Sequence, residues 1–146
     1  MRTALGGLCL VLVAAVTQGQ EERPAAKEVE VAVLAKTTKS WDGTALPAYP
    51  KGQPEVSIIR YTIPPKTRMA LHKHTVINAG VLLKGKLTVV AEDDKVLEMK
   101  AGDAIVELVD KWHYGVNSSD EPAEILVVYA GTEGQSNTLR PGEATR

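Results

Sequence analysis

Cysteine is almost absent from this chain. The 146-residue sequence contains one cysteine, Cys9, and that residue lies in an apolar run close to the N-terminus. A single thiol excludes an internal disulfide framework, and removal of the apolar run would leave neither a thiol nucleophile nor a cysteine-bound zinc site. The stability of the fold must therefore come from its packed core rather than from covalent cross-links.

A surplus of charge of either sign is also missing. The chain has 17 basic and 18 acidic residues, for a formal net charge of −1, and no block of like charges. Proteins that bind nucleic acid usually carry a basic surplus, so we expect no nucleic-acid partner. The hydrophobic fraction of 44% and charged fraction of 24% are ordinary for a soluble globular domain.

The N-terminal residues have the pattern of a secretory signal peptide. Arg2 precedes an apolar run from Ala4 to Val16, and small residues follow at Thr17 and Gly19. We expect residues 1–19 to be removed after Gly19 and the mature protein to be periplasmic or secreted. An uncleaved anchor is the alternative, but the run is shorter than the roughly 20 residues that span a bilayer. We therefore expect no membrane insertion after cleavage.

The rest of the chain favours short β-strands over helices. No stretch from Glu30 to Gly131 sustains a helical apolar period, and β-branched runs recur with turn residues between them. This pattern predicts an all-β sandwich or barrel. Among the expected strands are residues 29–34, 56–63, 68–74 and 123–130. We expect an N-terminal strand and loop over residues 20–50, the main β domain over 51–132 and a flexible C-terminal tail over 133–146.

The three histidines of the chain are the candidates for its chemistry. His72 and His74 are two residues apart, so both side chains lie on one face if this segment is a strand. His113 comes much later. Three neutral imidazoles that converge on one point form an open divalent-metal site, with positions left for water or substrate. Three unrelated histidines are the alternative.

The residues around these histidines resemble the two motifs of the cupin superfamily. The first motif is His-x-His, then Glu, then Gly, and the corresponding residues here are His72, His74, Asn78 and Gly85. The second motif contains Gly, His and Asn, which match Gly102, His113 and Asn117. The resemblance covers about residues 63–117. It implies a single jelly-roll barrel (a double-stranded β-helix) of the cupin type over residues 51–132, similar to small exported single-cupin proteins.

Several residues depart from those motifs. The family motifs also have glycines where this chain has Lys66 and Asp110, and a proline where it has Leu108. These replacements alter turns. Asn78 replaces the glutamate ligand with a neutral amide, so that it is either a weaker fourth ligand or a residue that supports a turn. The resemblance implies a divalent transition metal, and an imidazole set leaves iron, manganese, zinc, nickel and copper open.

Two further residues are candidates for substrate binding. Arg68 has the strand parity of His72 and could hold a carboxylate or phosphate; an exposed arginine at the rim is the alternative. Glu107 alternates with Ile105 and Val109. It is either a buried acid or base beside an imidazole, or a charge on the outer face.

The function that follows is an exported cupin that binds one divalent metal ion. The resemblance implies a small-molecule dioxygenase, isomerase or decarboxylase-type metalloenzyme. A non-catalytic barrel that binds a small ligand or a metal is the alternative, since cupins include both kinds of protein. The resemblance also implies a possible homodimer through an edge strand.

Overall fold

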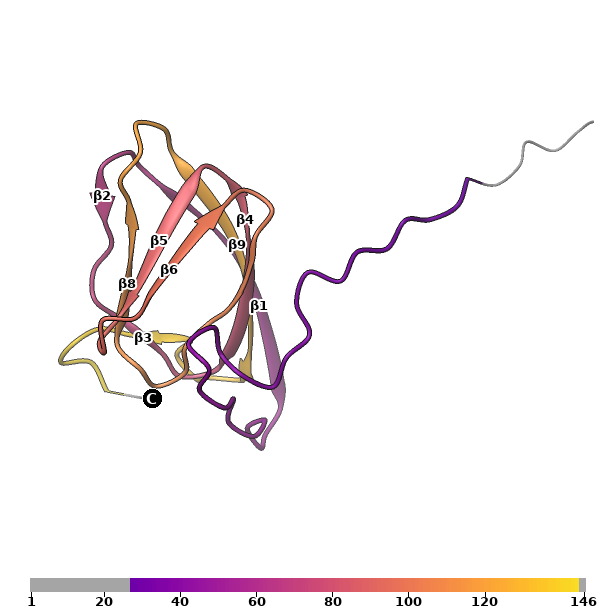
Figure 1. Cartoon of the computed structure of the whole chain (residues 1–146). Helices are drawn as coiled ribbons and strands as arrows, with labels where there is room; N and C mark the ends of the chain where they lie inside the picture. Colours follow the sequence, from indigo (N-terminus) through magenta and orange to yellow (C-terminus); the bar gives the residue numbers. More distant parts are fainter. Residues whose placement is uncertain (1–26, 145–146) are drawn as a thin grey trace, which may run out of the picture. The chain divides into compact units, whose positions relative to one another are not determined.

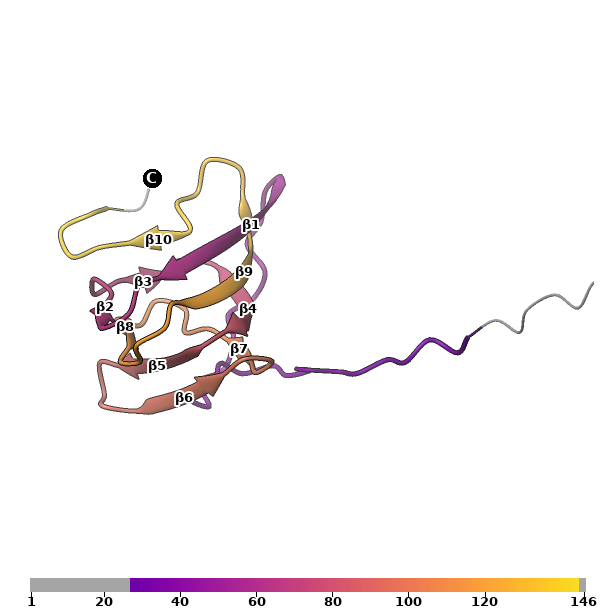
Figure 2. The ribbon, with the colours of Figure 1, turned by 90° about the horizontal axis from the view of Figure 1, so that it is seen from above.

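Two four-stranded antiparallel sheets face each other and form the fold (Figures 1 and 2). The structure is a computed structural model, and it describes residues 27–144. One sheet has the order β1-β9-β4-β7, the other has the order β2-β8-β5-β6, and β10 pairs with β3 in a small third sheet. The strands are β1 Pro54–Ile63, β2 Thr67–Arg68, β3 Lys73–His74, β4 Ile77–Lys84, β5 Lys86–Ala91, β6 Val96–Lys100, β7 Ala104–Val106, β8 His113–Asn117, β9 Ala123–Thr132 and β10 Thr138–Leu139.

Long-range pairing determines this topology. β1 pairs with β9 along its whole length, from Pro54 opposite Thr132 to Ile63 opposite Ala123. β4 pairs with β9 on the other side, so neighbours in the sheet come from distant parts of the chain. The described residues contain no helix. The prediction of an all-β jelly-roll barrel is therefore confirmed.

No helix within residues 27–144 has the length and apolar character needed to cross a membrane. The expected signal peptide, residues 1–19, lies outside the described part of the chain and stays a prediction.

Strict alternation places the core between the two sheets. Along β9 the inward residues Ala123, Ile125, Val127 and Tyr129 are buried. Side chains on successive residues of a strand point to opposite faces, so one face of each sheet packs inside and the other meets solvent.

The expected strand at residues 29–34 is wrong. These residues form no strand, and Val29 and Val33 are 86% and 74% exposed. A valine-rich run favours a strand only where another strand pairs with it, because β-propensity depends on context. The chain divides into two compact units after Val31, and residues 32–146 form the larger unit.

The segment from residue 68 to 74 also differs from the prediction. It is not one strand: β2 and β3 are separate, and residues 69–71 lie between the pairs Arg68–Val116 and His72–His113. Three residues on this side therefore lie opposite two on β8, as in a β-bulge. An extra residue reverses the alternation of inward and outward side chains. Arg68 and His72 consequently do not share a face.

The flexible tail expected after residue 132 is wrong for its central part. Thr138 and Leu139 form β10, which pairs with His74 and Lys73 of β3. Leu139 is buried. The burial of Leu139 and the backbone pairing offset the entropy of ordering this segment.

The residues that replace motif glycines keep the glycine-like backbone. Lys66 and Asp110 both have a φ of 54°, in the left-handed region. Side chains other than glycine adopt this region at a cost of about 1–2 kcal/mol. The turns are therefore preserved although the residue types differ.

Asn117 joins the ends of three segments. Its side chain is fully buried, donates to the carbonyls of Ile63, Pro64 and Glu121, and accepts from Ser119. Asn117 therefore ties the turn after β8 to the end of β1.

We expect Asn117→Ala to lower the free energy of unfolding by about 3 kcal/mol, because buried carbonyls and an amide would lose their partners. Urea unfolding measures the change. Ser118→Ala, at an exposed neighbour in the same turn, is the matched control. Equal stability of the two variants would contradict the structural role of Asn117.

Candidate metal centre

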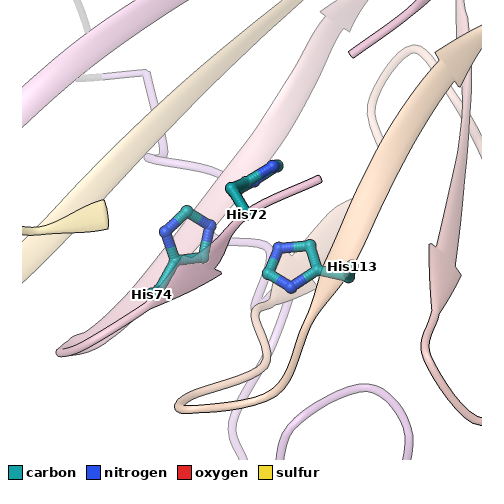
Figure 3. A group of neighbouring side chains, drawn as sticks. All are labelled: His72, His74 and His113. Atoms are coloured by element: carbon teal, nitrogen blue, oxygen red, sulfur yellow. The ribbon is translucent and has the colours of Figure 1, made fainter. Parts of the chain in front are cut away.

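The fold brings the three histidines together from two segments that are far apart in the sequence (Figure 3). His113 begins β8, and His72 lies beside it in an isolated bridge. The two residues exchange backbone hydrogen bonds of 2.9 and 2.8 Å, which holds their side chains next to each other. His74 belongs to β3 and reaches the same point from the adjacent segment.

The three rings surround one position. Ring centroids are 5.0 Å apart for His72 and His74, 4.5 Å for His72 and His113, and 4.9 Å for His74 and His113. One nitrogen from each ring lies within 4.8 Å of the other two, so these side chains can hold a metal ion. The predicted convergence of the three histidines is present.

Each imidazole already uses its Nδ1 atom. Nδ1 of His72 lies 2.9 Å from the Ala70 carbonyl, and Nδ1 of His113 lies 2.9 Å from the Lys111 carbonyl. A carbonyl oxygen only accepts, so both rings donate from Nδ1, and their neutral forms keep a free lone pair on Nε2. Nδ1 of His74 is 3.0 Å from the hydroxyl of Thr138. Hydrogen bonds of this kind orient imidazoles that bind metals.

The cluster is electrically neutral near pH 7. Burial, together with the nearby His113 and His72, lowers the pKa of His74 to about 3. Burial also lowers the pKa of His113 to about 4, against the opposing effect of its hydrogen bond to Lys111. For His72, burial lowers the pKa and the charge of Arg140 contributes. Neutral imidazole is the form that binds a metal.

Glu107 lies inside the barrel beside this cluster. Its side chain lines the cavity, and only 7% of the residue is exposed. Burial raises the pKa of Glu107 to about 7, although the Leu108 amide opposes the shift. Oε2 of Glu107 is 3.7 Å from Nε2 of His113, and neither atom has a hydrogen-bond partner. Of the two alternatives from the sequence, the buried position is the correct one.

Asn78 is buried on the inner part of β4. Its Nδ2 donates to the Val76 carbonyl at 3.1 Å, whereas its Oδ1 has no hydrogen-bond partner. Asn78 lies opposite Tyr129, whose ring lines the cavity. Its role as a fourth ligand stays a prediction.

Arg68 does not reach the cavity. It is exposed, and its guanidinium carbon lies 3.8 Å from the centre of the Tyr114 ring. The bulge described above accounts for this position. Arg140 lines the cavity instead, directly after β10. Sequence reasoning missed Arg140 because no local pattern shows that the C-terminal segment pairs with β3.

The cavity that contains these groups has a volume of about 270 Å³. Its polar lining also includes Tyr61 and Tyr129, whose hydroxyls are 3.1 Å apart. Burial and then the contact with Tyr61 raise the pKa of Tyr129. Both sheets contribute apolar residues to the walls, namely Ile63, Leu87, Val89, Ile125 and Val127.

The unpartnered atoms show that a divalent cation fits this site. Nε2 of His113 and Oε2 of Glu107 belong to residues that line the cavity, and both atoms are buried without a hydrogen-bond partner. Each carries a lone pair, and a buried polar atom without a partner is costly. Nitrogen and oxygen donors of this kind suit a divalent transition metal.

Comparison with solved structures identifies the same fold. An uncharacterised conserved protein with a double-stranded β-helix domain from Klebsiella pneumoniae aligns with a TM-score of 0.51 and 19% identity, over 62% of this chain and 85% of that chain. The DMSP lyase DddQ from Ruegeria pomeroyi aligns with a TM-score of 0.52 and 16% identity, over 59% and 43% of the two chains. Oxalate oxidase in complex with the substrate analogue glycolate aligns with a TM-score of 0.50 and 20% identity, over 59% and 46%.

This chain therefore spans less than half of the oxalate oxidase and DMSP lyase chains. No curated protein sequence matches it. The model of the cupin domain family matches residues 59–129, a range that includes the three histidines, Asn78 and Glu107. With the double-stranded β-helix of its fold, this match assigns the chain to the cupin superfamily.

Proposed function

We propose that this cupin holds one divalent transition-metal ion on His72, His74 and His113 and uses it to bind and transform a small carboxylate compound. One observation carries the proposal: three neutral imidazoles converge, two of them buried and that of His72 half-buried, and their Nδ1 atoms are already hydrogen-bonded. A bound divalent ion would supply Lewis-acid polarisation of an oxygen atom on the ligand. Iron, manganese, zinc, nickel and copper all remain candidates.

The rest of the cavity supports a small anionic ligand. The exposed Arg140 brings a positive charge to the wall of a cavity of about 270 Å³, which has room for a small carboxylate. A guanidinium recognises a carboxylate through paired hydrogen bonds. The structural neighbours include an oxalate oxidase in complex with glycolate, which is a small carboxylate. The apolar walls lower the local dielectric constant and so strengthen these polar interactions.

We expect Arg140→Gln to weaken glycolate binding to the zinc-loaded protein by about 10- to 100-fold. This factor corresponds to the loss of one charge-assisted hydrogen bond, which contributes about 1.5–3 kcal/mol. Calorimetric titration measures the affinity. Arg68→Gln is the matched control, because Arg68 is exposed and lies over Tyr114. Equal affinity of the wild-type protein and Arg140→Gln would remove Arg140 from ligand binding.

Within the enzyme proposal, the reaction is of the dioxygenase, isomerase or decarboxylase type. The alternative is a barrel that binds its ligand without chemistry, and the largely apolar walls favour it. Incubation of the metal-loaded protein with a panel of small carboxylates distinguishes the two. Formation of a new compound, followed by NMR, supports the enzyme; unchanged ligands that co-purify with the protein support the alternative.

Export and dimerisation belong to the same proposal. The sequence pattern of residues 1–19 supports export, and N-terminal sequencing of the mature protein tests cleavage after Gly19. A second copy of the chain would pair along β1, an edge strand whose outward Val56 and Ile58 are 64% and 67% exposed. Light scattering tests this dimer, and a strictly monomeric mature protein would contradict it.

A further inference from the structure

We infer that Glu107 is a direct ligand of the metal ion, so that the site consists of three imidazoles and one carboxylate. The inference rests on the proposed function, because it requires an ion on the three histidines. The position of the Glu107 carboxylate supports this inference, because its Oε2 atom faces Nε2 of His113 inside the barrel.

The carboxylate of Glu107 faces the ring of His113. Their Oε2 and Nε2 atoms are 3.7 Å apart, which is too long for a hydrogen bond. Nδ1 of His113 donates to Lys111, so Nε2 of the neutral ring presents a lone pair toward the carboxylate. Two electron-pair donors that face each other in a buried site gain energy when both bind one cation. Two atoms that each bind zinc at about 2.0–2.2 Å lie about 3–3.5 Å apart, close to the separation seen here.

Burial of this carboxylate without a compensating partner is costly. Among residues 27–144, no lysine or arginine forms an ion pair with Glu107, and its Oε2 has no hydrogen-bond partner. A buried, uncompensated carboxylate costs several kcal/mol. A divalent ion on the histidines would compensate that charge directly.

The backbone of Glu107 is held by hydrogen bonds on both sides. Its N–H donates to the Asn78 carbonyl at 3.0 Å, and its own carbonyl accepts from Ser40 Oγ at 2.7 Å. The residue before it, Val106, accepts from the backbone of Trp41 at 2.9 Å. With donor and acceptor both bonded, the backbone directs the side chain into the cavity. A ligand held by such contacts is pre-organised for its ion.

Asn78, which stands where the motif has its glutamate, is a backbone neighbour of Glu107. β4 and β7 pair through Ala79–Val106 and Gly80–Ile105, so Asn78 and Glu107 are the next neighbours along the same ladder. Both side chains are buried. The amide of Asn78 carries no charge, and Glu107 places a negative charge in the adjacent position. The site thus has one carboxylate, supplied by the neighbouring strand.

Co(II) titration of the metal-free protein tests the inference, with the dissociation constant from calorimetry and the ligand set from the visible absorption of the bound ion. We expect Glu107→Gln to bind Co(II) about 100-fold more weakly and to change the absorption spectrum, because even residues that only support a ligand contribute about 10- to 100-fold. Glu55→Gln, at an exposed position on β1, is the matched control and should keep the wild-type affinity and spectrum.

Moving the carboxylate provides a stricter test. The double variant Asn78→Glu/Glu107→Gln places it on the neighbouring strand, and we expect Co(II) affinity within about tenfold of wild type. The melting temperature of metal-free Glu107→Gln should equal or exceed that of the metal-free wild type, because a buried charge is removed. A structural role for Glu107 would lower that temperature instead.

The outcomes separate the two proposals. A wild-type protein that binds no stoichiometric Co(II) overturns the proposed metal centre itself. A wild-type protein and a Glu107→Gln variant that both bind one Co(II) with equal affinity and the same spectrum overturn the role of Glu107 alone. If Glu107→Gln does not fold, Glu107→Asp decides: its shorter side chain should weaken Co(II) binding about tenfold, and unchanged binding would refute the inference.

Discussion

Replacing His113 with alanine is expected to abolish stoichiometric binding of a divalent metal ion. Nε2 of His113 is buried and unpartnered, and its ring adjoins both other imidazoles and the carboxylate of Glu107. Residues that only support a metal ligand contribute about 10- to 100-fold to affinity, so loss of a direct ligand should cost more than about 100-fold. Metal analysis after removal and reloading of zinc measures the change.

Lys73→Ala is the matched control for this experiment. Lys73 stands between His72 and His74 in the sequence, but its ammonium group pairs with Asp110 at 3.3 Å instead of joining the cluster. We expect this variant to keep one zinc ion per chain. A His113→Ala protein that is folded by circular dichroism and still binds zinc as tightly as Lys73→Ala would show that the three histidines are not the metal centre.

The metal-free protein is expected to lose several kcal/mol of stability between about pH 6.5 and pH 4. In the unfolded chain a histidine takes up its proton near pH 6.5, whereas in the folded protein the pKa of His113 is about 4 and that of His74 about 3. A group whose pKa is lower in the folded protein stabilises the fold at pH values above its pKa in the unfolded chain, and this stability is lost as the pH falls toward the folded pKa. The lowered pKa of His72 acts in the same direction. Each of the two larger shifts corresponds to roughly 3–5 kcal/mol.

Glu107 opposes part of this loss. Its pKa is raised from 4.5 to about 7 in the folded protein, so its contribution is present at low pH and is lost as the pH rises through that range. On acidification the unfolded chain takes up protons on its three histidines, which favours unfolding, whereas the folded chain takes up a proton on Glu107, which favours folding. The histidines dominate, and stability should fall as the solution becomes acidic.

Urea unfolding at pH 7.5, 6 and 5, with and without zinc, measures this dependence. A bound ion requires neutral imidazoles, so zinc should stabilise the folded protein most at pH 7.5 and progressively less as acid competes for the same nitrogens. A metal-free protein whose unfolding free energy stays constant from pH 7.5 to pH 5 would contradict the burial of neutral histidines.

The parts of the site that sequence reasoning predicted correctly are those set by local spacing. His72 and His74 are two residues apart, and Gly85 and Gly102 mark turns that keep positive φ angles of 78° and 94°. Strand alternation and turn chemistry act over a few residues, so they can be read directly from the chain. The all-β class follows from the same local patterns.

The misplaced residues depend on pairing between distant segments. The bulge opposite β8 removed Arg68 from the face of His72, and the pairing of β10 with β3 brought Arg140 into the cavity. The register of such pairs is determined by core packing, and one extra residue exchanges the inner and outer faces of a strand.

The sequence by itself therefore determined the all-β class of the described domain and the three imidazoles that can hold a metal. The tertiary structure alone decided which charged side chains accompany them: Glu107 is buried inside, the exposed Arg140 lines the cavity, and Arg68 lies away from it. The reason is physical. Local spacing sets which residue types a strand can present, but only long-range register and burial decide which of its faces meets the cavity.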